Sequence, residues 1–353
     1  MKNREHIEIP SGSLNKAYII IINWNSWQHT IECLESVYRS DYRNFQVIVV
    51  DNGSTDDSLS HITQWANHDL CVLPTPGNAL AKYFHPPLEQ RIPVVRYTRR
   101  VAEQGGSSEF ESFASSRLPD NVGHPLILVD TQENLGFGGG NNVALRMIEA
   151  RGDGAFIWLL NNDTVIEPNT LSQMIASAVQ GPSIVGSVVM HYQDWHRIQS
   201  FGGGFVNPIT GRSTTAEKPL SHPVDFITGA SLLLNQKTLK MIGHFDESIF
   251  MYFEDVDICL RAKAQGIPIV VSPAKVYHKG GASSSNSYFQ WISVYRNKIY
   301  VLKKHYGLGP WAIGSMLMWM ANLVHPRADK NKKQASREAL HLLYEMIRNE
   351  MSK

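Results

Sequence analysis

The feature that most constrains the fold is a series of short apolar runs separated by helical segments. Residues 17–22 (AYIIII) form a continuous apolar run rich in isoleucine, which is typical of a strand buried on both faces. A helix is predicted over residues 27–38, and further strands over 45–50, 126–129 and 156–160. Strands that alternate with helices favour a parallel, doubly wound α/β sheet, which binds ligands at the carboxyl ends of its strands.

The second half of the chain shows a different pattern. Strands predicted over residues 185–190, 226–234 and 267–271 indicate a mixed sheet, and a helix is predicted to begin near Glu254. Beyond residue 286 the sequence predicts helices alone.

Residues 68–124 interrupt the alternation of strands and helices. This segment holds six prolines and polar clusters such as EQGGSS over residues 103–108, which predict a long inserted surface loop. The loop either covers the site or is an insertion without a function.

The composition excludes several classes of protein. The 33 Lys and Arg residues against 32 Asp and Glu leave a formal net charge of +1, which excludes a uniform polycation and predicts no nucleic-acid partner. Three cysteines are too few for a disulfide scaffold or a cysteine zinc site, and they fit a reducing compartment. We find neither a signal-peptide core nor an apolar stretch of about 18 residues, so a cytoplasmic protein is expected.

Two acidic residues directly follow predicted strands, and each has two interpretations. Asp51, in VVDNGSTDD, either forms a turn and helix cap or contacts a nucleobase or ribose. Asp163, in NND, either caps the next helix or holds Mg²⁺ or Mn²⁺ that bridges a substrate diphosphate.

A third acidic position begins the helix near Glu254. Asp257 and Arg261 are four residues apart and predict an ion pair, and Glu254 and Asp255 suit the positive end of the helix dipole. The apolar block at residues 250–253 favours another role for Glu254 and Asp255. Carboxylates beside it are partly desolvated, which raises their pKa and suits a general base.

The glycine-rich segment 136–142 (GFGGGNN) invites comparison with a dinucleotide-binding loop. The fingerprint fails because Asn141 stands where the third glycine is required, although a close approach of the backbone to a nucleotide sugar remains an expectation. His278, which follows a predicted strand, is either a structural residue or a metal ligand.

Seven motifs in this order resemble glycosyltransferase family 2, in particular its bacterial rhamnosyltransferase-type branch. The resemblance covers about residues 17–305. The motifs are INWN (22–25), VVDNGSTDDS (49–58), ENLGFGGGNN (133–142), LLNNDT (159–164), FITGASLLL (226–234), FDESIFMYFEDVDICLRAKAQG (245–266) and HKGGAS (278–283).

The resemblance implies a GT-A fold, in which a Rossmann-like nucleotide-binding sheet is fused to an acceptor-binding half. It implies an N-terminal tail over residues 1–16, a GT-A domain over 17–285 and a helical extension over 286–353. It further implies inverting transfer of a sugar, with rhamnose as one candidate, from a nucleoside diphosphate to a glycan or lipid-linked acceptor.

The resemblance also assigns site residues. Asp255 matches the catalytic aspartate, with Glu254 beside it, and Asp163 and His278 match residues at the metal and diphosphate. Asn161 replaces the first carboxylate of the metal motif, which leaves fewer charged ligands. The predicted donor-binding residues are Asn23, Asp51, Asn134, Gly136, Gly138, Asn141 and Asn162.

The C-terminal region predicts a contact of its own. Residues 308–324 are strongly apolar, and residues 296–353 carry 11 Lys and Arg against 4 Asp and Glu, or +7. This composition suits peripheral docking of residues 303–337 on an anionic membrane at the inner face of the cell membrane. The other interpretation is a buried helix that packs on the catalytic domain or on a dimer partner.

Two other functions stay open at this point. A sugar-phosphate nucleotidyltransferase requires a glycine-rich basic loop after the first strand, where the chain instead has residues 23–27 (NWNSW). A non-catalytic protein that binds nucleotide sugars or glycans would bind the donor without turning it over.

Overall fold

The computed structural model describes residues 15–118, 123–178, 181–280 and 287–307, together with single positions between 309 and 341. Almost all of the predicted N-terminal tail lies outside the described residues. Most of the predicted membrane-docking segment does so as well.

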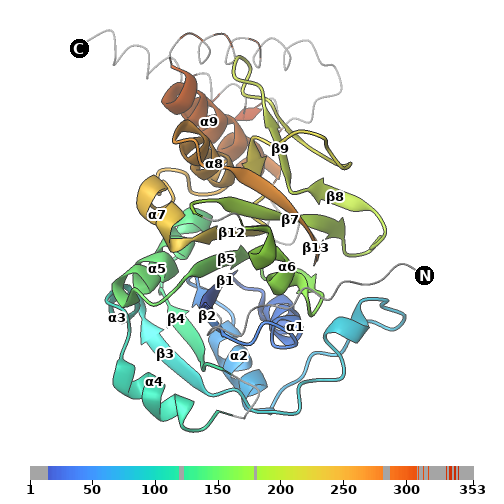
Figure 1. The fold of residues 1–353 in the computed structure, drawn as a ribbon, viewed down its shortest axis with the longest axis vertical. Helices are drawn as coiled ribbons and strands as arrows, with labels where there is room; N and C mark the ends of the chain where they lie inside the picture. The colour runs from blue at the N-terminus through green and yellow to red at the C-terminus, as the bar shows by residue number, and fades with distance from the viewer. Residues whose placement is uncertain are drawn as a thin grey trace.

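A sheet of ten strands forms the centre of the described part of the chain (Figure 1). Five parallel neighbours make up one half of it, in the order β3-β4-β2-β1-β5. Both faces of β1, β2, β4 and β5 are buried, as their continuous apolar runs predicted. Their bounds are Ala17–Asn23 (β1), Phe45–Asp51 (β2), Val94–Thr98 (β3), Leu126–Asp130 (β4) and Phe156–Leu160 (β5).

The other half of the sheet is mixed, as predicted. Strand β12 runs antiparallel to β5 and β7, and β13 runs parallel to β7. A small second sheet has the order β10-β9-β11. The carboxyl ends of β1, β5 and β13 therefore share one edge of the main sheet. The bounds are Thr164–Ile166 (β6), Ile184–His191 (β7), Ile198–Phe201 (β8), Gly203–Val206 (β9), Ser213–Thr215 (β10), Phe226–Ile227 (β11), Ser231–Asn235 (β12) and Ile269–His278 (β13).

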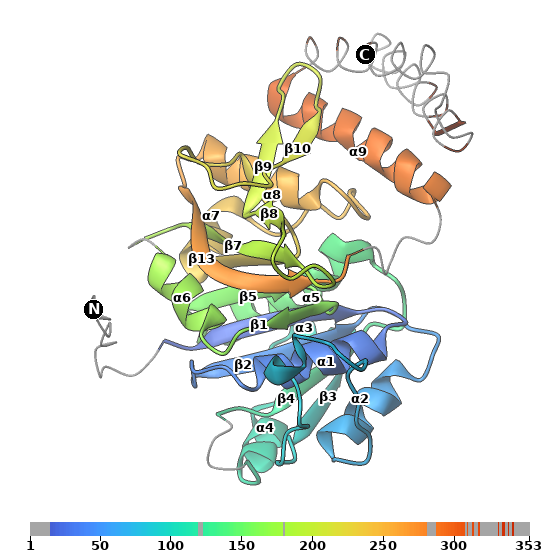
Figure 2. The ribbon, with the colours of Figure 1, turned by 90° about the vertical axis from the view of Figure 1, so that its right-hand side faces the viewer.

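Helices cover both faces of the main sheet (Figure 2). Helices α1, α2 and α6 contribute to the core on one face, and α3, α5, α7 and α8 to the core on the other. Their bounds are Trp27–Val37 (α1), Ser58–Ala66 (α2), Arg99–Glu103 (α3), Ser108–Ser115 (α4), Gly136–Arg151 (α5), Thr170–Ser177 (α6), Gln236–Ile242 (α7) and Glu254–Ala264 (α8).

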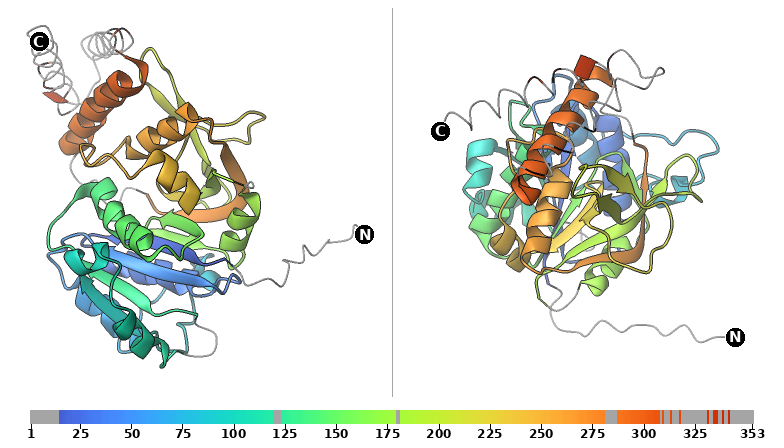
Figure 3. Two further views of the ribbon diagram at one scale, coloured as in Figure 1. Left: turned by 60° about the vertical axis from the view of Figure 1, so that its left-hand side comes forward. Right: turned by 90° about the horizontal axis from the view of Figure 1, so that it is seen from above.

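The long helix α9 (Ser287–Tyr306) lies beside α8 (Figure 3). Lys304 and His305 of α9 each contact Asp257 of α8 at 2.8 Å, and Arg261 completes the cluster at 2.9 Å. The predicted ion pair between Asp257 and Arg261 is therefore confirmed. The division of the chain at residue 285 stays a prediction. Among the described residues, no helix is long and apolar enough to cross a membrane.

The prediction of a surface loop over residues 68–124 is wrong for much of that segment. Val94–Thr98 forms the edge strand β3, and α3 and α4 follow it. A short 3₁₀ helix, η1 (Ala81–Tyr83), is flanked by Leu80 and Phe84, which are buried against β7 and β13. The six prolines concealed this order, since Pro93 stands directly before an edge strand, where proline is tolerated.

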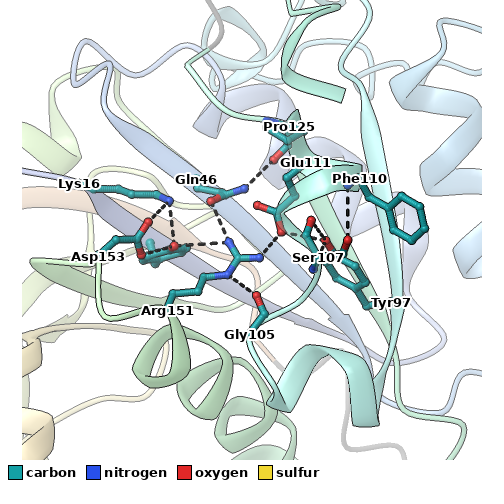
Figure 4. A network of polar contacts seen from close by, with 11 residues as sticks. Lys16, Gln46, Tyr97, Gly105, Ser107, Phe110, Glu111, Pro125, Arg151 and Asp153 are labelled. Atoms are coloured by element: carbon teal, nitrogen blue, oxygen red, sulfur yellow. Dashed lines mark hydrogen bonds and ion pairs between the residues drawn. The ribbon is translucent and has the colours of Figure 1, made fainter. Parts of the chain in front are cut away.

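A network around Arg151 attaches α4 to the sheet (Figure 4). The guanidinium donates to Gly105 O at 2.9 Å and to Gln46 Oε1 at 3.2 Å, and it forms an ion pair with Glu111. It also contacts the Tyr18 hydroxyl, which donates to Asp153 at 2.7 Å. The network lies at the amino ends of β1 and β2.

Two other strand predictions need correction. The strand predicted over residues 226–234 is interrupted, because residues 228–230 separate β11 from β12. The strand predicted over 267–271 starts at Ile269 and continues to His278, past an irregularity between Val271 and Lys275.

Candidate active site

Asp51 and Asn23 end neighbouring strands and are joined by a hydrogen bond. The Asp51 carboxylate accepts from Asn23 Nδ2 at 2.7 Å, from Ser54 Oγ at 2.7 Å and from the Ser54 N–H at 3.0 Å. Burial raises the pKa of Asp51, and these bonds offset part of the rise. Because Asp51 is 1% exposed and holds the turn together, its contact with a nucleobase stays a prediction.

The network continues toward the NND motif. Asn23 Oδ1 accepts from Thr30 Oγ1 at 2.7 Å, and Asn162 Nδ2 donates to the same Thr30 hydroxyl at 3.0 Å. Asn162 therefore faces α1. Asn161, by contrast, places its amide nitrogen 3.4 Å from His278 Nε2.

Asp163 and His278 meet at the carboxyl end of β13. Asp163 Oδ1 lies 3.1 Å from His278 Nε2, and Oδ2 accepts from the Gly280 N–H at 3.2 Å. Burial alone would raise the pKa of Asp163, but the hydrogen bond and charge of His278 outweigh it and hold the pKa below its ordinary value. Both residues predicted as metal ligands thus lie together.

The chemistry of this pair suits a divalent cation. His278 Nδ1 lies 2.7 Å from Gln199 Oε1, and an amide oxygen only accepts, so Nδ1 carries the proton. In a neutral His278 the lone pair of Nε2 would then face the Asp163 carboxylate, so either a second proton, on Nε2, or a cation must lie between the two groups. Adjacent ligands of an octahedral ion with bonds of about 2.1 Å are about 3 Å apart, close to the observed separation.

Two side chains alone do not complete such a site. Within the described ranges, no group of three or more His, Cys, Asp and Glu residues is placed to hold a metal. Mg²⁺ characteristically takes one or two carboxylates and leaves its other positions to water and substrate phosphates. Asp163 and His278 therefore fit a cation that the donor diphosphate helps to bind.

The glycines of α5 have a packing role that the sequence did not predict. Gly136 has a φ of +73°, and a Cβ there would lie 2.2 Å from the Phe250 carbonyl oxygen. A Cβ on Gly138 would lie 3.0 Å from Phe245 Cβ. The close approach is thus to the protein's own chain, and contact of these glycines with a donor stays a prediction.

The asparagines around α5 hold neighbouring backbone. Asn134 Oδ1 accepts from the Gly136 N–H at 2.9 Å and from Asn52 Nδ2 at 3.2 Å. Asn141 is buried and donates to Phe137 O at 2.9 Å. Asn134 and Asn141 thus hold the backbone around the start of α5. Their contacts with a donor stay predictions.

Asp255 lies in the first turn of α8, after a strained stretch of backbone. Tyr252 and Phe253 have φ values of +71° and +73°, where bulky side chains are rarely found. The buried Asn297 of α9 holds this conformation, since its Nδ2 donates to Met251 O at 2.8 Å and to Tyr252 O at 3.0 Å. Helix α9 thereby positions Asp255.

The two carboxyl groups at the start of α8 have different surroundings. Asp255 is half-buried and accepts from the N–H groups of Gly229 at 3.0 Å and Val256 at 2.8 Å, while burial raises its pKa. Glu254 is 7% exposed, and its Oε2 has no hydrogen-bond partner in the described part of the chain. Burial and then the charge of Asp255 raise the pKa of Glu254.

A turn connects Asp255 to the NND motif. Gly229 donates to Asp255, and the next residue, Ala230, accepts from the Asn161 N–H at 3.1 Å. The turn thus links the predicted base to the side of the sheet that carries Asp163 and His278.

The sequence analysis missed several polar residues at this edge. Gln199 orients His278, and Glu32 pairs with Lys279 at 3.0 Å. Asp130 ends β4 in register with Asp51 and is half-buried. Only Asp130 carried a signal, because it ends an apolar strand as Asp51 does.

Two family descriptions match the sequence. Glycosyl transferase family 2 matches residues 18–83, and Glycosyltransferase like family 2 matches residues 114–294, which is half of the chain. The chain belongs to glycosyltransferase family 2. The resemblance drawn from the seven motifs is thereby confirmed, and this family 2 protein is a glycosyltransferase that uses a nucleotide sugar.

Its curated relatives include rhamnosyltransferases. N-acetylglucosaminyl-diphospho-decaprenol L-rhamnosyltransferase of Mycobacterium tuberculosis (strain H37Rv) is 24% identical over 237 residues, which cover 60% of this chain and 76% of the relative. Rhamnosyltransferase WbbL of Escherichia coli (strain K12) is 24% identical over 176 residues, which cover 44% of this chain and 66% of WbbL.

Solved structures share the fold. S. aureus TarS 1–349 matches with a TM-score of 0.51 and 16% identity, over 92% of this chain and 79% of that chain. GalNAc-T7, solved with UDP, GalNAc and Mn²⁺, matches with a TM-score of 0.52 and 12% identity, over 93% of this chain and 55% of that chain. The predicted GT-A fold of the family 2 chain is confirmed.

Proposed function

We propose that this family 2 glycosyltransferase transfers a sugar, with L-rhamnose as the first candidate, to a hydroxyl group with inversion at the anomeric carbon. The observation that carries the proposal is the environment of Asp255. Its half-buried carboxylate has a raised pKa and two N–H donors, and no ion pair with a cation is seen in the described residues. The turn at Gly229 and Ala230 connects it to Asp163 and His278.

The chemistry is a single displacement. Asp255 accepts the proton of the acceptor hydroxyl as the hydroxyl oxygen attacks the anomeric carbon from the face opposite the diphosphate. The new carbon–oxygen bond forms while the bond to the diphosphate oxygen breaks, and the nucleoside diphosphate leaves. A raised pKa makes Asp255 a stronger base, and one displacement inverts the configuration.

Asp163 and His278 are the residues that would hold a divalent cation, Mg²⁺ or Mn²⁺. When bound, the cation supplies positive charge to the leaving diphosphate. One carboxylate and one imidazole suit Mn²⁺ better than Mg²⁺, which takes oxygen ligands. GalNAc-T7, of the same fold, was solved with Mn²⁺.

The relatives suggest the class of acceptor. The name of the Mycobacterium tuberculosis relative describes a sugar linked through a diphosphate to decaprenol. We extend this to a lipid-linked or polysaccharide acceptor for the present chain, with a GT-A domain over residues 17–285.

If the acceptor is lipid-linked, the basic C-terminal region would bring the enzyme to the membrane that holds it. We propose that the protein is cytoplasmic and docks peripherally on the inner face of the cell membrane through residues 303–337. Flotation with vesicles tests this: binding to vesicles with anionic phosphatidylglycerol, lost at high salt and absent with neutral phosphatidylcholine, is expected. No binding to either vesicle would contradict the docking proposal.

A donor panel tests the activity itself. We expect one of dTDP-rhamnose and the UDP-, GDP- and dTDP-hexoses to raise the melting temperature, and more so with Mn²⁺ or Mg²⁺. Product formation and the anomeric configuration, followed by NMR, then test transfer and inversion. A donor that binds but is neither transferred nor hydrolysed would instead support a binding protein.

A further inference from the structure

We propose that Lys279 is a ligand of the donor diphosphate, and that Glu32, Tyr192 and Asn78 form a support that fixes its ammonium group. The proposal rests on the proposed function, because it requires that a nucleoside diphosphate binds beside Asp163 and His278. It adds a positioning role for Asn78, which belongs to the segment first predicted as a surface loop.

The backbone of Lys279 belongs to the predicted diphosphate site. Its N–H donates to Asp163 O at 3.0 Å, and its two neighbours, His278 and Gly280, both contact the Asp163 carboxylate. The side chain is 17% exposed, so the ammonium group is partly desolvated while still reachable by a ligand. Charge-assisted bonds are stronger under these conditions.

The support holds Lys279 from two sides. Lys279 Nζ donates to Glu32 Oε2 at 3.0 Å and lies 4.8 Å from the centre of the Tyr192 ring. The Tyr192 hydroxyl donates to Glu32 Oε1 at 2.5 Å and accepts from Asn78 Nδ2 at 2.7 Å. Both oxygens of the buried Glu32 carboxylate are thus occupied, and the position of the ammonium group is fixed.

The support leaves part of the ammonium group without an acceptor. An ammonium group has three N–H donors, and Glu32 is its one hydrogen-bond acceptor in the segments that the structure describes. A simple counterion for Glu32 would not need Tyr192 and Asn78 to fix its direction. A lysine that binds phosphate oxygens gains from such a support. Its side chain is already ordered before the ligand arrives, so less side-chain entropy is lost on binding.

Calorimetry with UDP and dTDP, and with uridine and thymidine as matched ligands without phosphate, tests the proposal. We measure each affinity both with Mn²⁺ and with EDTA. Lys279→Met is expected to weaken binding of the nucleoside diphosphate about 10- to 30-fold, as for the loss of one charge-assisted hydrogen bond. Nucleoside binding stays unchanged, and Lys279→Arg retains most of the diphosphate affinity.

Variants of the support should weaken diphosphate binding less than Lys279→Met does. Tyr192→Phe and Asn78→Ala are expected to weaken diphosphate binding about two- to fivefold without changing nucleoside binding, because they loosen the ammonium group but leave its charge. A double variant, Lys279→Met with Glu32→Gln, leaves no buried unpaired carboxylate and keeps the test valid if the single variant is unstable.

The outcomes separate this proposal from the proposed function. If Lys279→Met binds nucleoside diphosphates as wild type does, or loses nucleoside affinity equally, Lys279 is not a diphosphate ligand. If wild-type protein binds no nucleoside diphosphate and turns over no donor, the proposed function itself fails.

Discussion

The polar cluster around Arg151 lies at the amino ends of β1 and β2, whereas Asp163 and Asp255 lie toward the opposite edge of the same sheet. In the Arg151 cluster, two cations, Arg151 and Lys16, face two carboxylates, Glu111 and Asp153. Charges and hydrogen bonds are balanced there. Such a cluster is complete without a ligand.

The carboxyl-end cluster is built differently. Among the residues that the structure describes, Asp255 has N–H donors and no ion pair, and Glu254 has an oxygen without a partner. The backbone that precedes them is strained. Asp163 Oδ1 faces His278 Nε2 across 3.1 Å, a contact that needs a proton or a cation between the two atoms. The comparison teaches that incompleteness, and not the number of charged residues, distinguishes the candidate site from a structural cluster.

The largest expected difference between the two clusters is in kcat, when one carboxylate of each is replaced by an amide. Asp255→Asn is expected to lower kcat at least about 1,000-fold, because an amide cannot accept the proton of the acceptor hydroxyl. Donor binding, measured by calorimetry, stays nearly intact. The matched control is Asp153→Asn, which should lower stability and leave kcat close to wild type. Wild-type turnover by Asp255→Asn would refute the assignment of the base.

The Arg151 cluster should respond in stability instead. Arg151→Met leaves Glu111 without its cation and Gly105 O and Gln46 Oε1 without their donor, so we expect a loss of about 3–5 kcal/mol in the free energy of unfolding. Urea denaturation measures it, and the activity per folded molecule should not change. Arg91→Met, at an exposed arginine, is the control and should cost less than about 0.5 kcal/mol. Equal losses for the two variants would show that the cluster is not structural.

The sequence predicted the centre of the sheet well and its margin poorly. Strands β1, β2, β4 and β5 are buried on both faces, so their apolar runs were plain. Strand β3 lies at the edge, where Arg96 and Thr98 face solvent and Pro93 precedes it. Its pattern was therefore hidden among prolines and polar residues.

The site followed the same division. Asp163, His278 and Asp255 could be proposed as site residues from the sequence because each stands where a strand ends or a helix begins. Asn297 and Gln199 could not, since they act on backbone and side chains 46 and 79 positions away in the sequence. The packing role of Gly136 could not be predicted for the same reason: Phe250, which excludes a Cβ there, is distant in the chain.

Gly136 begins α5 and Gly152 directly follows it, so the two glycines can be compared. Gly136 and Gly152 have similar φ values, +73° and +69°, but a Cβ meets Phe250 O at the first position and nothing within 4 Å at the second. Gly152→Ala should cost about 1 kcal/mol from backbone strain alone. Gly136→Ala should cost about 3 kcal/mol and also lower kcat, because Phe250 belongs to the segment that positions Asp255. Urea denaturation and kcat measure both, and equal costs would exclude the Phe250 contact as the cause.

The stability of the protein should depend on pH with opposite signs through Glu254, at the candidate site, and through Asp153, in the Arg151 cluster. Burial and the charge of Asp255 raise the pKa of Glu254, so folded protein holds this proton more tightly than unfolded protein. Stability is therefore lost as pH rises through the folded pKa. Glu254→Gln removes that loss, and its stability relative to wild type should increase by about 1–2 kcal/mol between pH 5 and pH 8.

Asp153 supplies the opposite case. Burial alone would raise the pKa of Asp153, but the bonds from Lys16 and Tyr18 outweigh it and lower the pKa. Its contribution is present above the unfolded pKa and is lost as pH falls through the folded pKa. Asp153→Asn should thus lose more stability relative to wild type at pH 7 than at pH 3, by up to about 1 kcal/mol because the group is partly exposed. Urea denaturation at these pH values measures both differences, and slopes of the same sign for the two variants would contradict the distinction between the two clusters.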